Sequence, residues 1–193
     1  MKPDIDIVSD QDELLILVDR EDNELGFASK AECHFGSGLL HRAFSVFIFN
    51  SSGQVLLQQR SHQKELWGLY WSNSCCSHPR QGEQIESAAN RRIMEELSID
   101  CELLYLYKFL YQEPFGTKGS EHELCSVFVG HYDGEISINT NEISDWKFLD
   151  TQELTESIDQ SPEIYTPWLR SEWLELKKNY LDSINQALDL CLS

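Results

Sequence analysis

The strongest constraint on this chain is a segment with helical periodicity that carries charge on both of its sides. Between about residues 84 and 97, the apolar residues recur at helical spacing and form one broad arc: Ile85, Ala89, Ile93 and Leu97. Arg91 and Glu95 fall opposite this arc, toward solvent. Arg92 and Glu96 instead fall on the side that faces the interior, where a charged pair is costly unless it pairs internally or serves a ligand. We therefore expect a helix that packs against a strand and adjoins a functional site.

The loop before this helix contains a second set of candidate site residues. Cys75 and Cys76 are adjacent, and His78 follows, with its backbone restricted by Pro79. Most free cysteines are small buried hydrophobic residues without a chemical role. The loop position, the nearby histidine and the following helix N-terminus could each alter the acidity of a thiol. From these residues alone, either cysteine could face the site.

The composition is that of a single globular domain. With 193 residues, 41% hydrophobic and 25% charged, the chain can bury a sizeable core. The longest strongly apolar run, residues 43–49, is far shorter than a membrane span, and the acidic N-terminus lacks the apolar core of a signal peptide. We expect a cytoplasmic protein whose six cysteines are reduced, and the absence of a Cys-x-x-Cys pair argues against a zinc ribbon or a thioredoxin-type site.

The net charge limits the partners of this chain. A charge of −18 and a pI near 4.5 repel nucleic acids and anionic membranes, so we expect neither as a partner. An anionic small substrate would need a local basic pocket. Four of the 15 basic residues could supply one, although each alone is more simply a surface charge: Lys30, Arg60, Lys64 and Arg92. For the oligomeric state we favour a monomer.

Hydrophobic periodicity and turn residues predict the order of the elements. Strands are expected at residues 13–19, 43–49, 55–59, 103–111, 123–132 and 141–150. Helices are expected at residues 84–97, 151–160 and about 166–192, with a loop at 30–41 and an exposed turn at 112–122. The pattern indicates one α+β domain over residues 1–193, with a core at about 42–175 and a mixed sheet between helices.

Three histidines and two glutamates form a candidate metal site. His34 and His41 flank the predicted loop, and His78 follows the cysteines. Glu121 and Glu123 are two residues apart, so both point to the same face if the segment is extended. Such a set suits zinc, manganese or iron. Any one of these features alone is better explained as a solvated strand end with scattered histidines.

With these residues identified, the sequence resembles the type I isopentenyl-diphosphate delta-isomerases of the Nudix-fold superfamily. The resemblance covers roughly residues 30–173. Several separate segments carry it, in the family's order: His34…His41-Arg-Ala-Phe44, Gln58-Gln-Arg60…Lys64, Asn73–Pro79, Gly82-Glu83, Arg91–Leu97, Glu121-His-Glu123 and Thr166-Pro-Trp168. It implies a Nudix-type mixed sheet sandwiched between helices, in a single domain.

The resemblance also implies an activity. The family interconverts isopentenyl and dimethylallyl diphosphate, precursors of isoprenoids, by protonation and deprotonation through a tertiary carbocation. Cys76 and Glu123 match the family's acid/base pair, and Tyr111 matches the helper that hydrogen-bonds to Glu123. Lys30, Arg60, Lys64 and Arg92 match its diphosphate-binding residues. Trp168 matches the aromatic residue over the hydrocarbon end, where an indole face would stabilise a cation.

Two divalent metals are implied by the same resemblance. His34, His41, His78, Glu121 and Glu123 match the residues that hold a manganese- or zinc-type ion. Glu96 matches the ligand of a magnesium ion that also meets the substrate's diphosphate. Carboxylate oxygens and phosphates are ligands that magnesium prefers.

The chain departs from the common Nudix box, Gly-x5-Glu-x7-Arg-Glu-U-x-Glu-Glu-x-Gly-U, where U is aliphatic. Ser77 and Ser98 stand at its two glycines, and Arg92 stands at a glutamate. Because the hydrolases use these carboxylates to bind the metals that activate water, Arg92 weakens the alternative of a Nudix pyrophosphohydrolase. Another alternative, an inactive binding protein with this fold, is not favoured because Cys76, Glu123 and Glu96 are all present.

Overall fold

Strand β3 (His41–Phe49) is the centre of the fold, in a computed structural model that describes residues 8–190. It runs parallel to β8 (Gly119–His131) and antiparallel to β6 (Cys75–Ser77), so the sheet is mixed, as predicted. The remaining strands are β1 (Leu14–Val18), β2 (Glu24–Ser29), β4 (Gln54–Arg60), β5 (Trp71–Ser72), β7 (Leu103–Phe115) and β9 (Ile143–Asp150).

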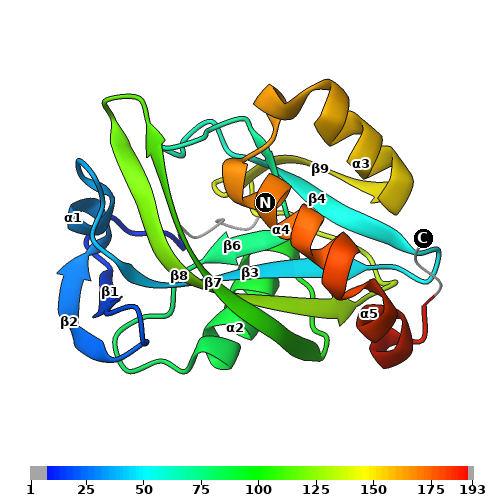
Figure 1. Ribbon diagram of the computed structural model, residues 1–193, viewed down its shortest axis with the longest axis horizontal. Coiled ribbons are helices and arrows are strands. Elements are labelled where there is room, and N and C mark those ends of the chain that lie inside the picture. Colours follow the sequence, from blue (N-terminus) through cyan, green and yellow to red (C-terminus); the bar gives the residue numbers. More distant parts are fainter. Residues whose placement is uncertain (1–7, 191–193) are drawn as a thin grey trace, which may run out of the picture.

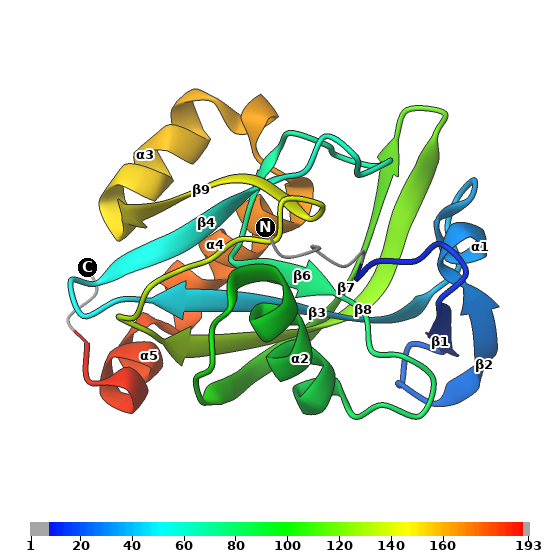
Figure 2. The same ribbon diagram turned by 180° about the vertical axis from the view of Figure 1, so that it is seen from behind.

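Helices cover the sheet on two sides (Figures 1 and 2). Side chains of β3 alternate between them, as the two-residue period of a strand requires. Phe44, Val46 and Ile48 pack against α2 (Ile85–Leu97), whereas Phe47 and Phe49 pack on the side of α4 (Pro167–Asn179) and α5 (Leu181–Leu188). The remaining helices are α1 (Lys30–His34), α3 (Thr151–Gln160) and the short 3-10 helix η1 (Pro162–Ile164). The expected sandwich of helices around a mixed sheet is confirmed.

The exposed turn predicted at residues 112–122 is wrong. Strands β7 and β8 continue through it as a long hairpin, and only Gly116–Lys118 lie outside the strands. The sequence pattern misled because Pro114 and two glycines are typical of loops. Among the strands of the described residues, β7 pairs with β8 alone, and an edge strand tolerates a proline. The correction places Glu121 and Glu123 inside a regular strand.

The loop predicted at residues 30–41 is also partly wrong. Residues Lys30–His34 form helix α1, which begins with a capping box between Ser29 and Glu32. His34 is the last residue of this helix, and His41 is the first residue of β3. Both histidines are therefore held by regular structure and not by a loose segment.

The single C-terminal helix predicted at about 166–192 is two helices, α4 and α5. The chain leaves the helical conformation at Tyr180, whose φ and ψ are −126° and −9°, and residues 191–193 lie outside the described part. The ring of Tyr180 stacks on Tyr107, and the break lets both Trp173 and Ile184 enter the same core. None of the helices within residues 8–190 is long and apolar enough to cross a membrane.

Helix α2 ends at Ser98, which stands where the Nudix box has a glycine. Ser98 adopts a left-handed conformation, with φ of 57°, which glycine adopts more readily. Its backbone N–H bonds to the carbonyls of Ile93 and Met94, so the helix closes despite the serine.

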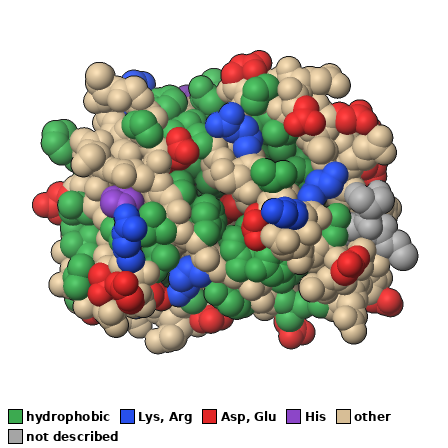
Figure 3. All heavy atoms as spheres, in the orientation of Figure 1, with side chains coloured by type: hydrophobic (Ala, Val, Ile, Leu, Met, Phe, Trp, Pro, Cys, Tyr) green, Lys and Arg blue, Asp and Glu red, His purple; other side chains and the backbone are tan. Residues whose placement is uncertain are grey.

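Acidic side chains are spread over the face shown in Figure 3 and do not gather in one patch. The basic residues on that face are few and separated. This distribution agrees with the net charge of −18.

Candidate active site

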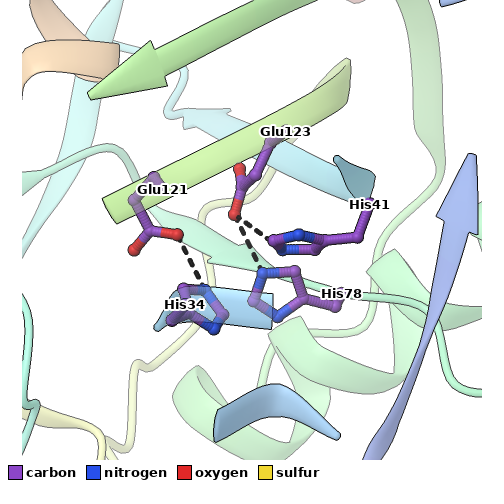
Figure 4. Close-up of side chains that lie close together, drawn as sticks. All are labelled: His34, His41, His78, Glu121 and Glu123. Atoms are coloured by element: carbon purple, nitrogen blue, oxygen red, sulfur yellow. Dashed lines mark hydrogen bonds and ion pairs between the residues drawn. The ribbon is translucent and has the colours of Figure 1, made fainter. Parts of the chain in front are cut away.

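Three histidines and two glutamates meet at one end of the β3–β8 pair (Figure 4). His41 lies opposite Glu123 in the parallel ladder, and Glu121 is two residues earlier on the same face. His34 comes from the end of α1, and His78 follows β6. One nitrogen or oxygen atom from each of the five lies within 4.8 Å of the others. The sequence prediction that these residues form one cluster is confirmed.

Short contacts join the imidazoles to the carboxylates. His34 Nε2 lies 2.8 Å from Glu121 Oε2, and His78 Nε2 lies 2.9 Å from Glu123 Oε1. His41 Nε2 is 3.6 Å from the same Glu123 oxygen, too far for a hydrogen bond, and is buried without a hydrogen-bond partner among residues 8–190. A buried donor or acceptor without a partner is costly, so the cluster is arranged for a ligand.

The other ring nitrogen, Nδ1, of His34 and of His41 lies at a backbone carbonyl. His34 Nδ1 is 2.7 Å from the carbonyl of Lys30, and His41 Nδ1 is 2.7 Å from that of Leu39. A carbonyl only accepts, so each Nδ1 donates, and a neutral His41 keeps its lone pair on Nε2. In His34, Nε2 faces the Glu121 carboxylate, and although burial acts to lower the pKa of His34, Glu121 outweighs it and raises the pKa, so a metal ion would replace a proton on this nitrogen. With two buried carboxylates, this donor set fits a borderline divalent cation.

Burial and neighbouring charges shift the pKa values in the cluster. Burial, together with His41 and His34, holds the pKa of His78 well below its ordinary value, so His78 is neutral. For Glu123, burial acts to raise the pKa, but the nearby His41 imidazole and the hydrogen bond from Tyr111 outweigh it and the pKa is lowered. The site therefore combines a neutral imidazole with an ionised carboxylate, the protonation states that metal binding requires.

A thiol and a carboxylate with opposite proton affinities line the cleft beside this cluster. The phenol of Tyr111 donates a 2.6 Å hydrogen bond to Glu123 Oε2. Burial raises the pKa of Cys76 to about 11, although Arg60 acts against it from 3.4 Å. Cys76 thus holds a proton while Glu123 has lost one, the difference expected of an acid/base pair.

The orientation of β6 decides between the two cysteines. Successive residues of a strand face opposite sides. Cys75 is fully buried in the core beneath α2, whereas Cys76 packs with Trp67 and Trp168 on the cleft side. Cys76 is therefore the cysteine that faces the site.

The cleft is lined by both charged side chains and an aromatic side chain, Trp168. Its charged and titratable lining residues are Lys30, His34, Arg60, Lys64, Glu65, Cys76, His78, Tyr111, Glu121, Glu123 and Glu142. Of the tryptophans, Trp168 lines the cleft, and its indole meets that of Trp67 edge to face with centroids 5.2 Å apart. Trp168 is 3% exposed, and its Nε1 donates to Ser72 Oγ at 3.0 Å. The guanidinium of Arg60 lies 5.2 Å from the Trp168 centroid.

Comparison with known proteins shows the family to which this chain belongs. The NUDIX domain model matches residues 39–169. The isopentenyl-diphosphate Delta-isomerase 1 of Photorhabdus laumondii is 44% identical over 174 residues, covering 89% of this chain and 99% of the relative. An isopentenyl-diphosphate Delta-isomerase 2 of Aromatoleum aromaticum is 46% identical and covers 80% of this chain and 82% of the relative. This chain belongs to the type I isopentenyl-diphosphate delta-isomerase family.

Solved structures show the same fold at low sequence identity. The protein DR0079 of Deinococcus radiodurans has a TM-score of 0.70 at 24% identity, covering 84% of this chain and 98% of that one. A MutT protein of Methanosarcina mazei has a TM-score of 0.61 at 14% identity, covering 74% of this chain and 96% of that one. These likenesses confirm the Nudix fold of the isomerase family.

In this isomerase-family chain, the interior charged pair predicted on α2 is present. Arg92 and Glu96 are 1% and 2% exposed, and Arg92 donates to Glu96 Oε1 from Nε at 2.9 Å and from Nη2 at 2.5 Å. Arg92 also donates to Val8 O at 2.6 Å. Within the described residues, the cleft at this position is lined by Ser9 and Glu142, and the Arg92–Glu96 pair lies behind them.

Two buried glutamates were not found from the sequence. Glu142 precedes β9, is 2% exposed and contacts Lys64 and Arg92. Glu172 of α4 is 1% exposed and lies three residues after Leu169 on the apolar side of its helix. Helical periodicity could have revealed Glu172, but no local signal distinguishes Glu142 from a surface glutamate.

Proposed function

We propose that this protein interconverts isopentenyl and dimethylallyl diphosphate, with Cys76 and Glu123 as its acid/base pair. One observation supports this most strongly. A protonated thiol and an ionised carboxylate line the same cleft, together with three basic residues and the indole of Trp168. This arrangement suits an anionic substrate with a hydrocarbon tail that reacts by proton transfer.

The reaction needs one proton delivered and one removed. One member of the Cys76–Glu123 pair gives a proton to the terminal alkene carbon, and a tertiary cation forms. The other member removes a proton from the methylene group next to the cationic carbon, and the new double bond forms between that methylene carbon and the cationic carbon. Tyr111 orients Glu123 through its 2.6 Å hydrogen bond, so that the carboxylate lies on the reacting face. After the reaction, the group that gave a proton is deprotonated and the other group is protonated. Proton exchange with water restores the starting state of both groups.

The aromatic lining of the cleft stabilises the cation. The face of Trp168 attracts positive charge, and Trp67 and Leu66 help to exclude water that would capture the cation. Ser72 fixes the Trp168 ring through its Nε1 hydrogen bond.

The five residues of the cluster fit one of the family's metals: His34, His41, His78, Glu121 and Glu123 would hold a manganese or zinc ion. The second, magnesium, would be bound by Glu96 together with the diphosphate, which requires Glu96 to release Arg92 and to reach the cleft. A bound divalent ion supplies positive charge, which keeps a coordinated carboxylate ionised and neutralises phosphate oxygens.

Four basic residues would bind the diphosphate. Lys30, Arg60 and Lys64 line the cleft, and Arg92 lies behind Glu142. Burial, with Lys64 and Arg92 nearby, lowers the pKa of Lys30 to about 8, the shift expected where cations gather before an anion arrives.

Product analysis tests this function against that of a Nudix pyrophosphohydrolase. The protein is incubated with isopentenyl diphosphate and magnesium, and dimethylallyl diphosphate and released phosphate are measured together. We expect dimethylallyl diphosphate and no phosphate above the protein-free background. Phosphate release without isomerised product would refute the isomerase assignment and support hydrolysis.

A further inference from the structure

Among residues 8–190, Leu66 is the one residue with an aliphatic side chain that lines the cleft. It is 7% exposed and belongs to a buried cluster with the indoles of Trp67 and Trp168. Cys76 and Tyr111 pack against the same cluster. The hydrocarbon part of the proposed substrate is apolar and reacts beside Cys76, so it would lie against Leu66.

The backbone at Leu66 is held by Arg60. The Nη2 atom of Arg60 donates to the carbonyl of Leu66, and Nε donates to the carbonyl of Trp67, both at 3.2 Å. The Nη1 atom of the same guanidinium lies 3.4 Å from Cys76 Sγ. One rigid planar group therefore fixes the Leu66–Trp67 segment relative to the thiol.

The conformation of this segment is unusual and is maintained by packing. Trp67 and Leu69 both adopt left-handed backbone conformations, with φ of 49° and 66°, which residues other than glycine rarely adopt. The ring of Trp67 packs against Phe115 and Trp168, with centroid distances of 4.8 and 5.2 Å. Such a backbone persists only where its surroundings hold it. The segment therefore cannot move aside for a larger ligand without losing these contacts.

Strand β8 supports the side chain of Leu66 from another direction. A Cβ atom added to Gly119, the first residue of β8, would lie 3.4 Å from Leu66 Cδ2 and 2.4 Å from the carbonyl oxygen of His34. The strand passes this close to both residues because glycine has no side chain. Leu66 is thus confined by β8 and by the indoles, and an extra methylene group placed against it would be overpacked.

We propose that Leu66 restricts the substrate to a five-carbon alkenyl group. A larger hydrocarbon would need the space that the Leu66 side chain fills, and it would hold the alkene away from Cys76 and Glu123. The inference rests on the proposed isomerase function and deepens it, because it adds a specificity-determining residue to the same cleft.

Turnover of two substrates tests this proposal: isopentenyl diphosphate, and its homologue with an ethyl group in place of the methyl branch. We expect the kcat/KM of the wild type to be at least about tenfold lower for the homologue, since one extra methylene group in a fitted apolar site costs roughly 10- to 200-fold. In Leu66→Ala the difference should fall to about threefold or less, and Leu66→Val should give an intermediate value. The matched control is Leu69→Ala, because Leu69 is exposed, lies in the same segment outside the cleft, and should keep the wild-type ratio.

The ratio of the two kcat/KM values distinguishes this role from a structural one, since a general loosening of the fold would lower both values. Leu66→Val removes only one methylene group and guards against a failure of Leu66→Ala to fold. A wild type that converts both substrates equally well, or an unchanged ratio in the folded Leu66 variants, would overturn the role of Leu66 and leave the proposed function standing. If the wild type converts neither substrate, the proposed function is wrong and the inference fails with it.

Discussion

Tyr111 and Glu123 are opposite one another in the β7–β8 ladder, and the phenol donates a 2.6 Å hydrogen bond to the carboxylate. The other oxygen of Glu123 faces His78 at 2.9 Å. One carboxylate therefore joins the metal cluster to the cleft in which the proposed proton transfers take place. This relationship leads to the first prediction.

Replacing Tyr111 with phenylalanine should lower kcat about 10- to 100-fold, since a hydrogen bond to a charged group is worth about 1.5–3 kcal/mol. KM for isopentenyl diphosphate should change less than threefold, because the phenol orients Glu123 and does not hold the diphosphate. Steady-state kinetics measure both. Tyr107→Phe is the matched control, since Tyr107 lies on the same strand and its buried hydroxyl has no hydrogen-bond partner in the described part of the chain. Equal losses in the two variants would contradict the role of Tyr111.

The two cysteines should behave differently. Cys76→Ala should lower turnover at least about 100-fold, as expected when a general acid or base is removed. Cys75→Ala should retain most of the turnover, but should unfold at lower temperature because it leaves a small cavity beneath α2. Kinetics and thermal unfolding of both variants check this. Full activity in Cys76→Ala would exclude the proposed acid/base pair.

Loss of one imidazole should weaken metal binding. His34→Asn should reduce the affinity for manganese or zinc by at least about 100-fold, since changes outside the ligand shell already cost 10- to 100-fold. Equilibrium dialysis with metal analysis measures the bound ion. His62→Asn is the control, because His62 is exposed and lies outside the cluster. An unchanged metal content in His34→Asn would contradict the assigned ligand set.

The buried carboxyl of Glu172 should make the protein less stable as the pH rises. Burial, partly offset by a hydrogen bond from Ser45, raises the pKa of this carboxyl to about 8. In the unfolded chain this carboxyl loses its proton near pH 4.5, whereas in the folded protein it keeps the proton until about pH 8. The free energy of unfolding is therefore not lowered by this group below pH 4.5, and it falls as the pH rises from 4.5 toward 8. Glu172→Gln should therefore raise Tm at pH 8 and make little difference at pH 4.5. The same Tm difference at both pH values would show that the carboxyl does not titrate in this way.

The sequence predicted features that depend on local periodicity. Arg92 and Glu96 were placed on the interior side of α2 because their angular position follows from the helix alone, and they are buried. The pairing of Glu121 with Glu123 on one face followed from the two-residue period of a strand. The resemblance to the isomerase family linked these features to His34, His41 and His78.

Features that depend on contacts between distant segments could not be predicted in this way. The buried carboxylate of Glu142 is paired with Lys64 and Arg92, which are 78 and 50 residues away in the sequence. Pro114 is typical of a turn by its local sequence, and whether a strand tolerates it depends on which strands pair. The break at Tyr180 depends on its stacking against Tyr107, which belongs to another strand.

Isomerisation in deuterated water tests the central claim most directly. Isopentenyl diphosphate is incubated with the protein in deuterium oxide, with and without a chelator, and the dimethylallyl diphosphate is examined by mass spectrometry and NMR. The account predicts deuterium in a methyl group of the product, and loss of both product and label when the chelator is present. Product that forms without deuterium, or at an unchanged rate after the metals are removed, would contradict it.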